Sequence, residues 1–182
     1  MSTTQAPSLT TWKIDPTHTN VEFAVKHLMI TTVKGRFADV HGTVRLDDKD
    51  LTTGDVDVTI GTASIDTREP QRDAHLRSAD FFDVEKFPAI RFRSTRIEHV
   101  SDDRYRLVGD LTIRDVTQEV VLDTAVEGRR KDPWGGERAG FSATTKINRG
   151  TFGLNWNQLL EAGGVVVGDE IKISLDVELL KQ

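Results

Sequence analysis

The chain has 182 residues, enough for one domain with a hydrophobic core that needs no disulfide or structural metal. Its 24 Lys and Arg residues against 29 Asp and Glu residues give a formal charge of -5, which argues against a nucleic-acid-binding protein. The sequence contains no cysteine, which excludes disulfides, thiolate metal sites, iron–sulfur clusters and a cysteine nucleophile.

The N-terminal segment is polar and shows no periodicity. We therefore predict a disordered tail over residues 1–10 and a single domain over residues 11–182. The tail lacks the basic start and apolar core of a secretory signal, so we expect a cytoplasmic protein, periplasmic only if the chain is a processed form. No stretch approaches the ~20 apolar residues of a membrane helix, and we expect no stable membrane insertion.

Apolar and polar residues alternate with a period of two along much of the chain, which is typical of half-buried β-strands. The clearest runs are 40–46, 55–60, 104–114, 141–147 and 170–179. Turn-forming residues lie between these runs. One apolar and one solvated face per strand indicate antiparallel pairing in consecutive hairpins.

Segment 71–87 breaks this alternation. Its apolar residues, among them Leu76, Phe81 and Phe82, fall among charged residues without strict period two, and Pro88 follows the segment. This pattern predicts one or two short helices inserted near residues 71–87.

An antiparallel sheet of seven to nine strands has edges that must be covered, either by closure into a barrel or by stacking as a sandwich. The residues alone leave both architectures open. Some of the positions that alternation assigns to the apolar face of a strand hold small or mildly polar residues. Examples are Gly42, Gly109, Ala143 and Thr145. They would leave space inside a barrel, which favours a ligand there.

The five histidines show no spacing that would place two imidazoles on one metal ion. Nucleophile elbows, phosphate-binding loops and dinucleotide fingerprints are also missing from the sequence. We therefore predict no metal site, no catalytic residues and no cofactor. His27 and His75 could meet at the mouth of a cavity, and Arg149 precedes a glycine-flanked aromatic loop.

Several ordered blocks together resemble the YceI-like family of bacterial polyisoprenoid- or lipid-binding proteins. The resemblance spans residues 12–180. The blocks are 12–15 with His18, 21–23, 25–29, 33–37, 64–67, 72–83, 87–88, 90–92, 109–114 and 149–153.

The resemblance implies an all-β, extended antiparallel lipocalin-like barrel of about eight strands, often a homodimer. Its cavity would bind, sequester or transport a long-chain amphipathic lipid of the polyisoprenoid, isoprenoid quinone or fatty-acyl type, without catalysis. Within this reading we expect lipid-binding residues in the cavity wall or beside it. Those expected to line the cavity are Phe23, Phe92, Leu111, Ile113, Phe141 and Phe152. Those expected close to its polar end, or to the loops that shape it, are His27, His75 and Arg149.

Two alternatives remain from the residues alone. One is an enzyme that uses His27 or His75 as a general acid or base on a hydrophobic ligand in the barrel. The other is a β-sandwich interaction module with a packed interior and no ligand in a cavity.

Overall fold

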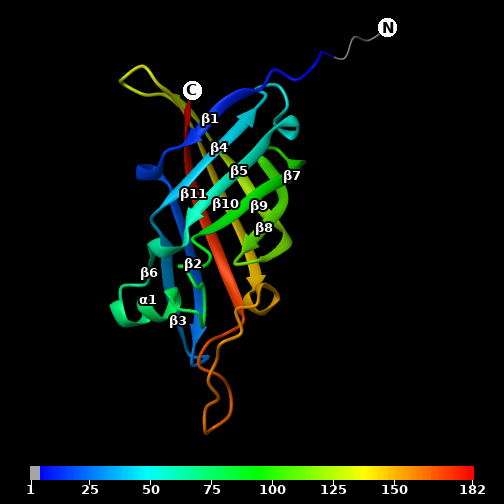
Figure 1. Cartoon of the computed structure of the whole chain (residues 1–182). Helices are drawn as coiled ribbons and strands as arrows, with labels where there is room; N and C mark the ends of the chain where they lie inside the picture. The colour runs from blue at the N-terminus through cyan, green and yellow to red at the C-terminus, as the bar shows by residue number, and fades with distance from the viewer. Residues whose placement is uncertain (1–4) are drawn as a thin grey trace.

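Eight antiparallel strands close into a barrel in the computed structural model, which describes residues 5–182 (Figure 1). The ring runs β1-β4-β5-β7-β8-β9-β10-β11 and closes where β11 pairs with β1. The strands are β1 (Thr10–Ile14), β4 (Val40–Leu46), β5 (Asp55–Gly61), β7 (Ala89–Ser101), β8 (Arg104–Ile113), β9 (Val116–Lys131), β10 (Glu137–Asn148) and β11 (Glu170–Lys181). The predicted barrel is confirmed. The sandwich alternative is wrong, because one continuous ring takes the place of two stacked sheets.

Three further strands lengthen the wall at one end, drawn as the lower end in Figure 1. They are β2 (Asn20–His27), β3 (Thr31–Phe37) and β6 (Ile65–Asp66). One half of β11 pairs with β1 and the other half with β2, because a short 3-10 helix, Pro16–His18, separates β1 from β2. The sheet therefore continues past the closed ring as β11-β2-β3-β6.

The first residues of the chain precede this sheet. Residues 1–4 of the predicted tail lie outside the described residues, and residues 5–9 form no helix or strand. The backbone N–H of Ser8 donates to Asp47, and β1 already begins at Thr10.

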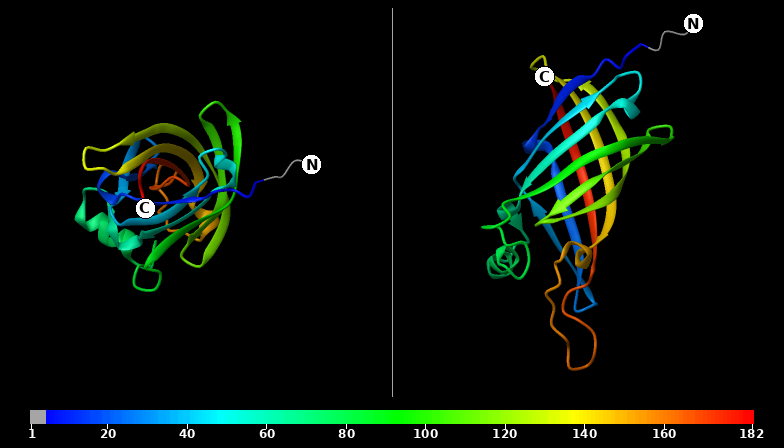
Figure 2. Two further views of the ribbon diagram at one scale, coloured as in Figure 1. Left: turned by 90° about the horizontal axis from the view of Figure 1, so that it is seen from above. Right: turned by 45° about the vertical axis from the view of Figure 1, so that its right-hand side comes forward.

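The inserted segment contains one α-helix, α1, over Pro70–Arg77. Its first turn is capped by Glu69, whose carboxylate accepts hydrogen bonds from the backbone N–H groups of Gln71 and Arg72. The rest of the segment up to Phe87 consists of hydrogen-bonded turns. Of the one or two helices predicted near 71–87, the structure has one, and Figure 2 shows it outside the ring of strands.

Three arginines hold this insertion, which we call the cover segment (residues 70–87), against the barrel. Arg72 donates to the hydroxyl and the carbonyl of Thr67, both at 2.7 Å. Arg77 donates to two backbone carbonyls beside β6, at 2.9 and 3.0 Å. From the β8–β9 turn, Arg114 donates to the carbonyl of Phe81 at 3.2 Å. The cover segment is thus fixed on both of its flanks.

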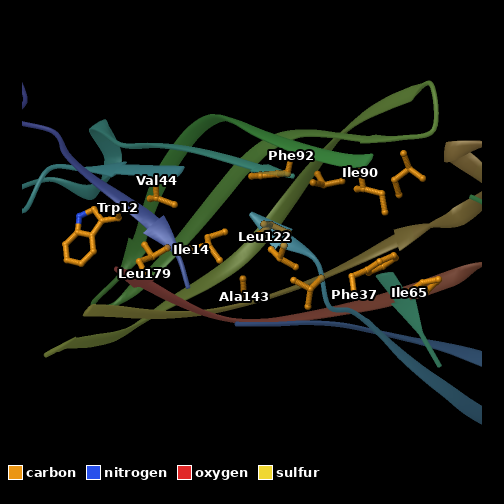
Figure 3. Packing of buried hydrophobic residues seen from close by; sticks show 14 of the residues in the cluster. Trp12, Ile14, Phe37, Val44, Ile65, Ile90, Phe92, Leu122, Ala143 and Leu179 are labelled. Carbon is orange, nitrogen blue, oxygen red and sulfur yellow. The ribbon is translucent and has the colours of Figure 1, made fainter. Parts of the chain in front are cut away.

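Buried apolar side chains lie along the inside of the barrel, from Trp12 near one end to Ile65 toward the other (Figure 3). Trp12 is fully buried, and the guanidinium of Arg129 lies 4.9 Å from the centre of its ring. Near the lower end, Phe152 and Leu154 are also buried. Buried side chains are thus present at both ends of the barrel. No helix among residues 5–182 is long and apolar enough to cross a membrane.

Charged side chains join the start of the chain to its last strand. The carboxylate of Asp15 accepts hydrogen bonds from the hydroxyl of Thr17 at 2.6 Å and from Arg138 at 2.7 Å, and it lies 2.9 Å from Nδ1 of His18. Arg138 also donates to Glu178 of β11. Hydrogen bonds from Thr17, His18 and Arg138 hold the pKa of Asp15 well below its usual range. The hydrogen bond with Asp15 raises the pKa of His18, and the negative charge of Glu178 raises it further.

Replacing Asp15 with Asn should destabilise the protein most at mildly acidic pH. The contribution of Asp15 is complete above its ordinary pKa of 3.8 and is lost as the pH falls toward the lowered folded pKa. The contribution of His18 is complete below 6.5 and is lost as the pH rises through the raised folded pKa. Urea unfolding of the parent and of Asp15→Asn should therefore differ most between about pH 4 and 6.5. A difference that stays constant from strongly acidic to alkaline pH would contradict this assignment.

Candidate functional site

An elongated cavity of about 290 Å³ lies inside the barrel. Small-molecule sites typically occupy roughly 300–1,000 Å³, so this volume suits one slender ligand better than a bulky one. Alternate residues of β11, from Ile171 to Leu179, line the cavity. The eight steps from residue 171 to residue 179, at about 3.3 Å each, make roughly 26 Å of strand, so the cavity follows much of the length of the barrel.

The wall is apolar because each strand turns one face inward. On β11 the inward residues are isoleucine, leucine and valine, and the residues between them are charged or polar. The residues Val56, Val58 and Ile60 of β5, three strands away around the ring, repeat this pattern. The strand alternation seen in the sequence thus forms the site itself.

The structure places five of the nine expected residues in the strand wall of the cavity. They are Phe23 of β2, Phe92 of β7, Leu111 and Ile113 of β8, and Phe141 of β10. The expected position of Phe152 is corrected. Its ring is buried in the core but does not line the cavity, because a 3-10 turn over Arg149–Phe152 ends the strand alternation of β10.

Arg149 also lines the cavity, at the lower end, and its side chain is only 4% exposed. Its guanidinium donates to the backbone carbonyls of Leu154, Trp156 and Gly168 at 2.8 to 2.9 Å. It also reaches the carbonyl of Val167 at 3.3 Å. Burial lowers the pKa of this arginine. Because all these acceptors belong to residues 153–169, which we call the β10–β11 loop, Arg149 folds that loop over the end of the barrel.

The two expected histidines lie beside the cavity rather than in its wall. The ring of His75 on α1 packs edge-on against Trp156 at 4.6 Å and against Phe81 at 5.2 Å between centroids. Its Nε2 lies 2.8 Å from the carboxylate of Asp80. His27, at the end of β2, forms a backbone bridge with Val167. Both histidines therefore shape the lower end, where the cover segment and the β10–β11 loop meet.

Three wall residues come from the cover segment, and the sequence interpretation did not assign them to the site. Leu76, Phe81 and Phe82 all line the cavity. The available signal was their apolar character in a segment otherwise rich in charge. Without tertiary contacts, that signal was equally compatible with a helix that packs elsewhere.

Two of the described residues that line the cavity carry charge. Glu22 is exposed, and the guanidinium of Arg149 is hydrogen-bonded to backbone carbonyls. The side chains that remain can bury a hydrocarbon chain, and they offer it shape and contact area rather than an ionic partner.

Comparison with known proteins agrees with this geometry. The chain is 43% identical over 145 residues to the UPF0312 protein of Serratia proteamaculans, covering 79% of this chain and 75% of that protein. The crystal structure of Burkholderia cenocepacia BcnA superposes with a TM-score of 0.80 at 22% identity, covering 91% of this chain and 98% of BcnA. A polyisoprenoid-binding domain from Saccharophagus degradans superposes with a TM-score of 0.72 at 13% identity, covering 96% of this chain and all (100%) of that domain.

The model of the YceI-like domain matches residues 12–179, which include every strand of the ring except the first two residues of β1 and the last two of β11. This match spans the whole barrel and the cover segment. The chain therefore belongs to the YceI-like domain family.

Proposed function

We propose that the protein binds one long-chain amphipathic lipid inside its barrel and sequesters or carries it without a covalent step. The ligand class is polyisoprenoid, isoprenoid quinone or fatty acyl. The observation that carries this proposal is the elongated, apolar cavity of about 290 Å³. The polyisoprenoid-binding domain of Saccharophagus degradans, which shares the fold, supports the same class of ligand.

Hydrocarbon burial supplies the affinity in this mechanism. Each methylene removed from water contributes about 0.8 kcal/mol. About ten buried methylenes would favour binding by roughly 8 kcal/mol before the entropy lost by the chain is subtracted. A slender chain gains most, because it can lie along the row of inward residues on β11.

The placement of the histidines supports binding rather than catalysis. An acid–base residue must reach the reacting atom of a bound ligand, directly or through one water. His75 is packed against Phe81 and Trp156, and His27 bridges to the β10–β11 loop, both outside the cavity wall. The family resemblance also leads us to propose a homodimer, for which sedimentation should give twice the mass of the chain.

The proposal is tested by filling the cavity. Ala143 points into the cavity from β10, and its neighbour Thr144 points outward. Ala143→Trp should weaken the binding of a fluorescent long-chain fatty acid by at least about tenfold, since the indole displaces several methylenes of ligand. Thr144→Trp adds the same side chain to the outer face and should bind like the parent.

Equal binding by both folded variants and the parent would place the ligand outside the barrel and refute the proposal. Circular dichroism of both variants checks that the strands are intact. If Ala143→Trp does not fold, Ala143→Leu provides a smaller filling, with a correspondingly smaller loss of affinity expected.

A further inference from the structure

The lower end of the barrel carries large apolar side chains that project into solvent. In the β2–β3 turn, Met29 is 56% exposed and Ile30 is 76% exposed. In the β10–β11 loop, Leu159 is 82% exposed. Figures 1 and 2 show this turn and this loop at the same end of the molecule.

Backbone hydrogen bonds join these two segments into one surface. The N–H of Leu28 donates to the carbonyl of Val166, and the N–H of Gly168 donates to the carbonyl of Lys26, both at 2.9 Å. Leu159 in turn forms a backbone bridge with Val165. The backbone hydrogen bonds therefore keep the β2–β3 turn and the β10–β11 loop, with their exposed side chains, next to each other.

The backbone of the β2–β3 turn is unusual for its sequence. Three residues, Leu28 to Ile30, join His27 to its partner Thr31, and Leu28 and Met29 have φ angles of 51° and 61°, in the left-handed region that favours Gly and Asn. Bulky side chains are disfavoured there. Apolar residues at such positions work against folding stability, and a binding role for the turn accounts for them.

Lysines line the outer face of the sheet just above this end. Lys146 of β10 pairs in register with Lys172 of β11. Lys172 lies opposite Ala24 of β2, which lies opposite Lys34 of β3. Lys146, Lys172 and Lys34 therefore form one row across four strands, and all three are exposed. This local positive row contrasts with the net charge of -5 on the whole chain.

Two acidic groups near this end lie beside cations, one of which belongs to the lysine row. Glu170 lies 3.8 Å from the ammonium of Lys146, and Asp169 lies 3.4 Å from the guanidinium of Arg149. Glu161, in the β10–β11 loop, is exposed. Among the described residues no ion pair engages Lys172 or Lys34, so these two lysines keep a local excess of positive charge on the row.

We propose that this surface, the lower tip, docks on a membrane that carries anionic lipid headgroups. The lower tip consists of Met29, Ile30 and Leu159 with the lysine row. Apolar side chains that enter the acyl boundary, flanked by cations at the level of the headgroups, form the combination that interfacial membrane binding requires. The inference goes beyond the proposed function, since it concerns where the protein acts rather than what the cavity holds.

A membrane fits the lower tip better than a protein partner does. A stable protein interface buries roughly 800 Å² on each side around a continuous apolar core. Here the exposed apolar side chains are three, Met29 and Ile30 from the β2–β3 turn and Leu159 from the β10–β11 loop, too few for such a core. A fluid bilayer surface needs no matching shape to accept them.

The test is co-sedimentation of the full chain with vesicles of phosphatidylcholine, with and without phosphatidylglycerol. The parent should bind the anionic vesicles more tightly than the neutral ones. Ile30→Asp and Leu159→Asp should each weaken this binding about tenfold, the factor associated with burying one such side chain. Lys34→Ala should weaken it about fivefold, and salt at about 1 M should remove most of the preference for anionic vesicles.

Matched controls come from the opposite end of the barrel. Trp134 is 83% exposed in the β9–β10 turn, which Figure 1 shows far from the lower tip. Trp134→Asp should leave vesicle binding unchanged, as should Lys49→Ala in the turn after β4. The proposal is wrong if the parent does not bind anionic vesicles, or if Trp134→Asp weakens binding as much as Ile30→Asp does.

A second copy of the chain is the competing occupant of the lower tip. Sedimentation of the parent and of Ile30→Asp tests it, and a fall in mass caused by the substitution would overturn membrane docking. Uptake of a fluorescent fatty acid in solution, without vesicles, separates this inference from the proposed function. Ile30→Asp should take up the fatty acid normally, and Ala143→Trp should still bind vesicles.

Discussion

Arg149→Met is expected to lower the free energy of unfolding by about 3–5 kcal/mol. Methionine keeps most of the length of the side chain but donates no hydrogen bond, so the carbonyls of Leu154, Trp156 and Gly168 lose their partner. Each buried acceptor left unpaired costs about 1–3 kcal/mol. For a chain of this size the melting temperature should fall by about 10 °C. Urea unfolding and thermal melting followed by circular dichroism measure both quantities.

Two control variants separate this effect from loss of charge alone. Arg104→Met removes an exposed arginine from β8 and should change the free energy of unfolding by less than about 0.5 kcal/mol. Arg149→Lys keeps the charge but not the planar set of N–H donors, so its stability should lie between the parent and Arg149→Met. Unfolding of Arg149→Met at the same urea concentration as the parent would show that the guanidinium does not hold the loop.

Ile113→Asp should weaken the binding of a long-chain lipid by at least about hundredfold. The side chain of Ile113 lines the apolar cavity from β8. A carboxylate there either remains hydrated and occupies ligand space with its water, or becomes buried beside hydrocarbon at a large cost. Lipid that copurifies with the parent should be absent from this variant, as measured by solvent extraction and by titration with a fluorescent fatty acid.

The neighbouring residue Thr112 provides the control on the same strand. Its hydroxyl faces Thr117 across the β8–β9 hairpin at 2.8 Å, away from the cavity. Thr112→Asp should therefore keep its lipid. Unchanged lipid content in a folded Ile113→Asp variant would remove Ile113 from the proposed site.

Strict alternation predicted the strands whose register is regular. The runs at 40–46, 55–60 and 170–179 agree with β4, β5 and β11 within a few residues. It was less informative for β7 and β9. In β7 the inward residues are Ile90 and Phe92, but after the register shift at Ser94 to Arg96 the inward residue is Ile97. A bulge changes the parity of a strand, so a fixed period of two does not follow it.

The residues in the wall of the cavity were more predictable from the sequence than the contacts that fold the β10–β11 loop over its lower end. Phe92 and Ile113 follow from strand parity, which a sequence displays directly. The role of Arg149 depends on carbonyls up to 19 residues away, brought together only when β11 returns alongside β10. No local pattern encodes such a contact, and in the sequence Arg149 could equally be a cation for a ligand headgroup.

Part of the family resemblance rests on residues that fix the cover segment. Arg72 and Arg77 donate to main-chain and side-chain oxygens near β6, and Asp73 accepts hydrogen bonds from Thr67. These contacts hold Phe81 and Phe82 over the cavity. The geometry of the wall thus accounts for the presence of these three charged side chains in the motif.

Native mass spectrometry of the purified protein, followed by solvent extraction of whatever dissociates, tests the central claim most directly. The barrel should release one long-chain prenyl or acyl compound per chain, and gentle activation should leave the protein lighter by that mass. An empty protein that also fails to take up a fluorescent long-chain lipid would contradict the account, because an elongated apolar cavity with no affinity for such a chain would need another explanation.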